Sequence, residues 1–224
     1  MACILSIESS TFRYSVALHA DGQLMAFEES RDPQQAASQL AVTIKKVLAS
    51  TSRPPDAIAV ASGPGSYTGL RIGVATAKGL CFATGARLLA VPTLQLMMYQ
   101  VRQARPGEHW YCPMLDARRM EVYVALFDEE GNVVQPTSAR IIDEHSFREE
   151  LDQHPILFFG DGAAKCRSVI HHPRAVFLDD IHPQASHLGE LAAGLWESRK
   201  WEDPQSFEPF YLKDFVAKKP KAFF

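Results

Sequence analysis

Residues 57–73 read AIAVASGPGSYTGLRIG, and this stretch decides the fold. Its first five residues form an apolar run with the length and composition of a buried strand. Gly63-Pro64-Gly65-Ser66 predicts a tight turn, because glycine permits backbone conformations that a side chain would forbid. The pattern at 70–84 predicts a helix after that turn, and the free N–H groups at its start would suit an anion. A turn with a purely structural role is the alternative.

The residues before this stretch predict three antiparallel strands followed by a helix. Two apolar runs, at 4–7 and 15–18, flank a polar turn, and Asp21-Gly22 is a hairpin signal before the third strand. Asp32-Pro33 then supplies an N-cap and a proline at the first helical position, so a helix is expected over 34–51. Its apolar stripe recurs at three-and-four spacing: Ala37, Leu40, Ile44, Val47 and Leu48.

Beyond residue 84, strands and helices continue to alternate. A short strand at 88–91 and a helix at 94–101 precede Arg105-Pro106-Gly107-Glu108, which is the best candidate for a domain boundary. Later strands and a last helix follow that boundary, at 121–127, 156–159 and 185–199. We therefore expect a mixed α/β protein with layered sheets, divided into an N-terminal lobe at 1–104 and a C-terminal lobe with a basic tail at 105–224.

Composition limits where the protein works and what it binds. Of its 224 residues, 46% are hydrophobic and 22% charged, so a globular chain with a sizeable core is expected. No apolar run approaches the roughly 18 residues that a bilayer crossing needs, and the start lacks the basic segment of a signal peptide. Four widely spaced cysteines indicate inert thiols in a reducing compartment. These features predict a cytoplasmic protein, and the net charge of −3 leaves any RNA to a more basic partner.

The polar turn after the first strand is the first motif that could carry chemistry. It reads Ile7-Glu8-Ser9-Ser10-Thr11 and places a carboxylate beside hydroxyls at a strand end. Loops that bind phosphate or metal-bound water sit at this position in the superfamily of actin, sugar kinases and heat-shock chaperones. An ordinary polar turn is the alternative.

Five strings, in order along nearly the whole chain, resemble the TsaB (YeaZ) family. They are IESST at 7–11, SGPGSYTGLRIGVATAKGL at 62–80, DARRMEVY at 116–123, FGDG at 159–162 and PFYLK at 209–213. The resemblance implies an actin-like ATPase (ASKHA) fold with two related lobes of mixed sheet flanked by helices. It also implies a non-catalytic accessory role in making threonylcarbamoyladenosine in tRNA. One departure is Ala36-Ala37, where many family members have His-Ser.

The resemblance further implies partners and sites. The chain is expected to bind TsaD, to meet the ATPase TsaE, to form a homodimer when alone and to contact tRNA only through the complex. No cofactor is required, although weak binding of ATP or ADP is conceivable. The residues expected to line a remnant nucleotide cleft are Glu8, Ser10, Gly63, Gly65, Ser66 and Arg71. The residues expected at the partner surface are Ala37, Leu40, Ile44, Val47, Gly73 and Ala77.

The catalytic relative TsaD shares the glycine loop but carries a metal-binding H-x-x-x-H soon after that loop, on a helix. Two imidazoles one helical turn apart can bind one cation. The equivalent positions here are Thr93 and Met97, and neither side chain can replace an imidazole at an iron or zinc site. No two of the eight histidines lie four residues apart, and all are interpreted as surface or capping residues. The sequence therefore predicts no metal site.

Two other enzyme classes use residue types that this sequence contains. A hydrolase would need a general base near the candidate nucleophiles Ser9, Ser66 or Cys81, and the sequence does not indicate which histidine would be that base. An independent ATP-dependent small-molecule kinase is the alternative function. Glu8 stands where such kinases have an Asp, and Gly160-Asp161-Gly162 could form a phosphate turn or merely end a strand.

Overall fold

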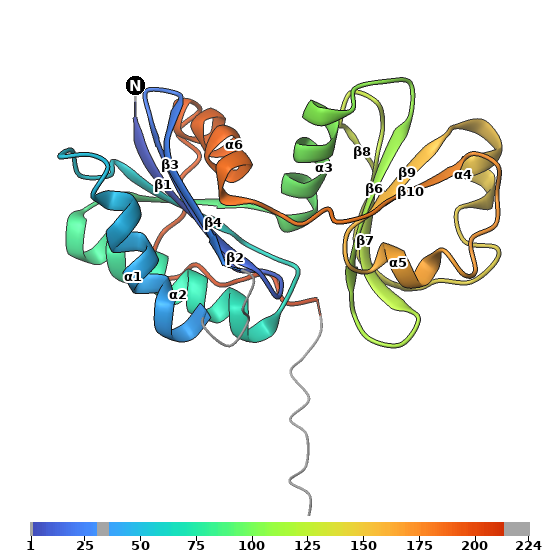
Figure 1. The fold of residues 1–224 in the computed structure, drawn as a ribbon, viewed down its shortest axis with the longest axis horizontal. Coiled ribbons are helices and arrows are strands. Elements are labelled where there is room, and N and C mark those ends of the chain that lie inside the picture. Colours follow the sequence, from blue (N-terminus) through green and yellow to red (C-terminus); the bar gives the residue numbers. More distant parts are fainter. Residues whose placement is uncertain (1, 31–35, 213–224) are drawn as a thin grey trace, which may run out of the picture.

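The chain folds into two lobes, each built around one five-stranded sheet (Figure 1). The structure is a computed structural model, and it describes residues 2–30 and 36–212. The predicted helix start at Asp32-Pro33 and the basic tail beyond residue 212 lie outside the described residues. Among those described, no helix combines the length and hydrophobicity that a membrane crossing requires.

The strands of the first sheet come from the first part of the chain, and those of the second sheet from the later part. The first sheet contains β1 (Cys3–Glu8), β2 (Tyr14–Ala20), β3 (Gln23–Ser30), β4 (Ala57–Ala61) and β5 (Arg87–Val91). The second contains β6 (Trp110–Asp116), β7 (Glu121–Phe127), β8 (Val133–Ile141), β9 (Ile156–Phe159) and β10 (Ala175–Leu178). The helices are α1 (Ala36–Leu48), α2 (Tyr67–Thr84), α3 (Thr93–Ala104), α4 (Arg148–Gln153), α5 (Ala163–Cys166) and α6 (Ala185–Glu197).

The two sheets have the same topology. The first has the strand order β3-β2-β1-β4-β5, and the second, from its other edge, the order β8-β7-β6-β9-β10. In each sheet the first three strands in sequence are antiparallel, and the last two add to them in parallel. A helix follows the third, fourth and fifth strand of each set. The lobes are therefore related, as expected from the sequence.

The last helix of each set packs on the sheet of the other lobe. α3 follows the first sheet but buries Leu94, Met97 and Val101 against strands of the second. α6 follows the second sheet but packs on the first, and its Ala185 N–H donates to the Ser15 hydroxyl of β2 over 2.9 Å. The predicted boundary between 1–104 and 105–224 separates the two sheets, whereas α3 and α6 each contact the sheet of the other lobe.

The glycine-rich string forms the turn and helix that the sequence predicts. α2 begins three residues earlier than expected, because the Ser66 side chain accepts a hydrogen bond from the Gly69 N–H and caps the helix. It ends at Gly85, which adopts a left-handed conformation with φ 76°. The side chains that α2 buries face the first sheet, so this helix and α1 cover the side opposite α6 (Figure 1).

Candidate functional site

Glu8 ends β1 with its side chain fully buried. Its Oε1 accepts hydrogen bonds from the Ser10 N–H, over 2.7 Å, and from the Ser10 hydroxyl. Its Oε2 has no hydrogen-bond partner among the described residues. Burial raises the pKa of Glu8 from 4.5 to about 7, against the opposing effect of the two Ser10 bonds. Close to neutral pH this carboxyl group therefore exists in both protonation states.

The turn after β1 packs directly on the glycine loop and on the start of α2. The Ser66 N–H donates to the Ser10 carbonyl oxygen over 2.6 Å, and the Ser9 hydroxyl donates to the Gly69 carbonyl oxygen over 2.9 Å. A β-carbon at Gly65 would overlap the Ser10 carbonyl oxygen, and one at Gly69 would overlap that of Ser9. These glycines are needed because two backbone segments approach each other here.

The structure brings some of the six predicted cleft residues together and places others apart. Glu8, Ser10, Gly65 and Ser66 lie together, but they contact one another instead of facing an open space. Gly63 instead contacts the C-terminal segment, since a β-carbon there would lie 2.7 Å from the Phe210 carbonyl oxygen.

Arg71, the sixth cleft residue, is also held apart from a cleft. It is exposed and stacks on Tyr67, with its guanidinium carbon 4.3 Å from the ring centroid. The two pockets described for this chain are lined by other residues.

The Gly160-Asp161-Gly162 turn follows β9 as the glycine loop follows β4. One oxygen of the Asp161 carboxyl accepts a hydrogen bond from the Asp116 N–H over 2.9 Å, and the Gly162 N–H donates to the Met114 carbonyl oxygen. Burial raises the pKa of Asp161. The turn ties β9 to β6 and also borders a pocket of about 250 Å³, so it has a structural role whether or not it binds a ligand.

Thr93 and Met97 lie one turn apart on α3, and both side chains are fully buried. Met97 packs within the apolar cluster between α3 and the second sheet, and the Thr93 hydroxyl has no hydrogen-bond partner among the described residues. Within residues 2–30 and 36–212, no group of three or more histidine, cysteine or acidic side chains is arranged to hold a metal ion.

Two histidines differ from the prediction that all eight are surface or capping residues. His19 on β2 is 4% exposed and His182 is 9% exposed. The ring of His19 lies against the Cα of Gly189 on α6, and burial lowers its pKa. The strand predicted from the sequence ends at residue 18, with apolar Val16 and Leu18 on one face. The prediction therefore does not place His19 on the opposite, buried face of β2.

Most of the residues predicted for the partner surface are buried within the first lobe. Leu40, Ile44, Val47 and Ala77 belong to the apolar cluster that α1 and α2 form with the first sheet. Gly73 is buried, and a β-carbon there would overlap the Ser9 hydroxyl. Ala37 lies outside the residues whose side chains are described. These positions serve the core, since both helices turn their apolar stripes inward.

A different set of residues forms the outer surface of the same two helices. Phe82 on α2 is 62% exposed and Val42 on α1 is 59% exposed. Ala75 and Gly79 precede Phe82 along the exposed side of α2, and a β-carbon at Gly79 would meet no atom within 4 Å. Phe82 is the sequence signal for this surface, because this aromatic residue lies outside the stripe of residues that α2 buries.

Known proteins match this chain over nearly its whole length. Residues 33–221 match the family described as TsaD, tRNA N6-adenosine threonylcarbamoyltransferase. The tRNA threonylcarbamoyladenosine biosynthesis protein TsaB of Bacillus subtilis is 28% identical over 94% of this chain and 93% of its own length. The TsaB protein of Escherichia coli is 27% identical over 96% of each chain.

A solved structure supports the same relationship. YeaZ from Pseudomonas aeruginosa has 25% sequence identity and a TM-score of 0.82, covering 95% of this chain and all of that one. The fold is thus the actin-like ATPase fold expected from the sequence, with two related lobes. On these matches the chain belongs to the family of TsaD, tRNA N6-adenosine threonylcarbamoyltransferase, and within it is recognised as a TsaB (YeaZ) chain of the threonylcarbamoyladenosine pathway.

Proposed function

We propose that this chain is a non-catalytic accessory subunit that binds a TsaD-type transferase and supports threonylcarbamoylation of tRNA. The observation that carries the proposal is the burial of Thr93 and Met97 at the positions where TsaD-like chains have their histidine pair. A threonine hydroxyl and a thioether are poor ligands for iron or zinc. Met97 also packs within an apolar cluster and Thr93 is fully buried, so a cation would reach neither side chain from solvent.

The state of the predicted nucleotide cleft supports the same role. Where a phosphate-binding loop would need free N–H groups, the Ser66 N–H is bonded to Ser10 and the Gly69 N–H to the Ser66 side chain. The loop contacts thus stabilise the first lobe. We infer that any ATP or ADP bound here is not turned over by this chain alone.

The outer surface of α1 and α2 is our proposed contact with TsaD. Phe82 is a large apolar side chain on the same exposed side of α2 as the small residues Ala75 and Gly79, and Val42 is exposed on the neighbouring α1. Small residues let a second helix approach closely. Two helices of a partner laid on this surface would make a four-helix arrangement, and about 800 Å² per side would qualify as a standard interface. A second copy of this chain would use the same surface when TsaD is absent.

The wider assembly is also part of the proposal. We propose that TsaE joins the complex, that tRNA is held mainly by the partner subunits, and that the complex works in the cytoplasm. The formal net charge of −3 supports a minor role for this chain in holding RNA.

The test is reconstitution of threonylcarbamoyl transfer with the TsaD-type enzyme of the same organism. The chain alone is expected to transfer nothing, and the complex is expected to be active. Phe82→Glu should weaken association by about tenfold or more, because a carboxylate at the centre of an apolar contact is desolvated without a partner. Val176→Glu is the matched control, since Val176 is 43% exposed on β10 of the other lobe.

Three results would contradict the proposal. Transfer or ATP turnover by the purified chain alone would indicate an enzyme, and phosphorylation of a small acceptor would favour the alternative kinase. Full TsaD binding by a folded Phe82→Glu protein would show that the contact lies elsewhere. Loss of binding in Val176→Glu as well would show that the effect of charge is not specific to α2.

A further inference from the structure

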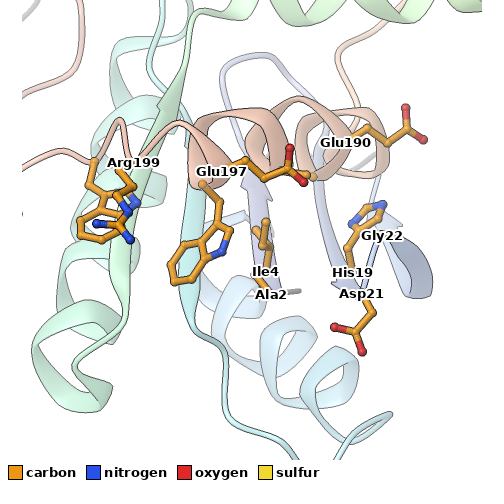
Figure 2. Close-up of a pocket in the computed structure, with 12 residues that line it drawn as sticks. Ala2, Ile4, His19, Asp21, Gly22, Glu190, Glu197 and Arg199 are labelled. Carbon is orange, nitrogen blue, oxygen red and sulfur yellow. The ribbon is translucent and has the colours of Figure 1, made fainter.

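A pocket of about 780 Å³ lies between α6 and the strands beneath it, on the side of the first sheet opposite α1 and α2. Figure 2 shows Ala2 and Ile4 on the strand below the helix, His19 toward one end and Arg199 at the other. The volume falls within the range of roughly 300–1,000 Å³ that small-molecule sites occupy. None of the residues discussed for the TsaD contact lines it.

Two indole rings form one wall of this pocket. Trp196 and Trp201 have their ring centroids 5.7 Å apart, with 35° between the planes. The segment after α6 is held in place because the Glu202 N–H donates to the Leu88 carbonyl oxygen of β5 over 2.9 Å. Arg87 already lies over Trp201, 4.5 Å from the ring centroid, so one indole of this wall binds a cation within the protein itself.

His19 lines the inner part of the pocket and is the unusual polar group there. Its side chain is 96% buried, yet neither ring nitrogen has a hydrogen-bond partner among the described residues. A buried polar group without a partner costs free energy, so it needs an explanation. Neutral imidazole offers one acceptor nitrogen to a ligand N–H.

Acidic side chains dominate the rim. Asp21, Glu190 and Glu197 line the pocket, against the single basic residue Arg199. Asp21 lies 3.6 Å from Arg53, and Glu190 lies 3.2 Å from His187.

Glu197 differs from the other two rim carboxylates. It is exposed and makes no ion pair with any residue in the described part of the chain. In Figure 2 Arg199 lies at the end of the pocket away from His19, and the Glu190 carboxylate points away from the strands.

We propose that this pocket binds an organic cation, an alkyl ammonium or guanidinium group, with its charge near Glu197 and its apolar body against Trp196 and Ile4. An aromatic wall beside an unpaired carboxylate is the combination that recognises such cations. An anionic ligand such as a nucleotide is disfavoured by the three rim carboxylates. The site is independent of the proposed TsaD contact, because the sheet separates the two surfaces.

Two sources can supply this chemistry: a free polyamine, or a lysine or arginine side chain of another polypeptide. Two probes separate them. Spermidine represents the free amine, and the peptide Ac-Gly-Arg-Gly-NH2 represents the side chain. The same peptide with citrulline in place of arginine is the neutral control, because it keeps the shape and removes the charge.

The measurement is tryptophan fluorescence in a Trp110→Phe background. Trp110 lies in the other lobe, so Trp196 and Trp201 alone then report. The expected result is a saturable change with spermidine or the arginine peptide below about 10 mM, and none with the citrulline peptide. Glu197→Gln should weaken binding by about threefold, and Trp196→Leu by about fivefold. Circular dichroism checks that each variant is folded.

The control variant is Glu130→Gln, which removes an exposed carboxylate from the turn between β7 and β8. It should leave the affinity for the cation unchanged. In ¹⁵N-labelled protein the ring signals of His19 should shift with the bound cation, a readout that general ionic effects on fluorescence would not give.

Tighter binding of spermidine would assign the site to a free amine, and tighter binding of the arginine peptide to a polypeptide. The proposal is overturned by equal binding of the citrulline peptide, by an unchanged affinity in folded Glu197→Gln, or by the absence of any saturable response. Failure of TsaD binding would leave these outcomes unaffected, since no partner is present in the assay.

Discussion

The titration of Glu8 should control how the stability of the first lobe depends on pH. Burial raises the pKa of Glu8 from 4.5 to about 7. Because each pKa unit is worth about 1.4 kcal/mol, this shift corresponds to about 3 kcal/mol between the two protonation states. The fold favours the protonated acid, because the ionised carboxylate of Glu8 would be fully desolvated. Its Oε2 would then have no hydrogen-bond partner among the described residues.

The direction follows from linkage. The unfolded chain releases the Glu8 proton near pH 4.5, but the folded chain keeps it until about pH 7. The contribution of Glu8 to the free energy of unfolding is therefore fully present below pH 4.5. It falls as pH rises from 4.5 to about 7, and above that it stays lower by about 3 kcal/mol.

Glu8→Gln removes this titration and keeps the shape. The amide oxygen can still accept the bonds from the Ser10 N–H and hydroxyl. The free energy of unfolding of the variant minus that of the natural chain should therefore grow by about 3 kcal/mol between pH 4.5 and 8. Taking this difference cancels the titration of other groups, including His19.

Urea unfolding across this pH range provides the test, with Glu130→Gln as the control whose difference should stay flat. Carboxyl ¹³C NMR of Glu8 gives a second readout, with an expected midpoint near pH 7. Parallel stability curves for the natural chain and Glu8→Gln, together with an NMR midpoint near 4.5, would refute the reasoning.

Four further perturbations test the packing. Leu40→Glu should cost about 4 kcal/mol or more, and circular dichroism should find it unfolded, because Leu40 is 2% exposed in the core. Gly65→Ala should cost about 3 kcal/mol or more in urea unfolding, since its β-carbon overlaps the Ser10 carbonyl; a neutral effect would contradict the loop contact. Gly79→Ala should raise stability by about 0.5–1 kcal/mol while weakening TsaD co-elution, because the space beside Gly79 is open in the chain alone. Cys112 should react with a thiol reagent only on unfolding, because burial raises its thiol pKa well above 9, and fast reaction of the native protein would show an opening of the second lobe.

The strands and helices could be predicted because their signals are local. An apolar run of five residues between a proline pair and a glycine turn predicts a short buried strand, and β4 lies there. The capping residue Ser66 marks the start of α2. The exchange of α3 and α6 between lobes could not be predicted. Periodicity identifies the buried face of a helix, but the residues of α3 would pack equally well on either apolar sheet.

The difference between the predicted partner residues and the exposed surface of α1 and α2 has a related cause. Gly73 and Gly79 are six residues apart in the same helix, and both are small residues in the sequence. Gly73 is small because the Ser9 hydroxyl of the neighbouring loop occupies the space of a side chain. A β-carbon at Gly79 would meet no atom within 4 Å in the described part of the chain. Only the positions of neighbouring segments distinguish a glycine that the fold needs from one that leaves room for a partner.

The two faces of the first sheet differ in a way that links the candidate sites. Alternation along β1 and β2 directs Cys3, Leu5, Val16 and their neighbours toward α1 and α2, where they form an apolar cluster. The opposite face carries Ser6, Glu8 and His19 beneath α6, and each has a buried polar atom without a partner among the described residues. Natural proteins usually give such buried polar atoms a hydrogen-bond partner. Exceptions concentrate where a function or a ligand compensates the free-energy cost of the missing hydrogen bond. The apolar face therefore fits a role in stabilising the lobe beneath a protein contact, whereas ligand chemistry is expected on the α6 face.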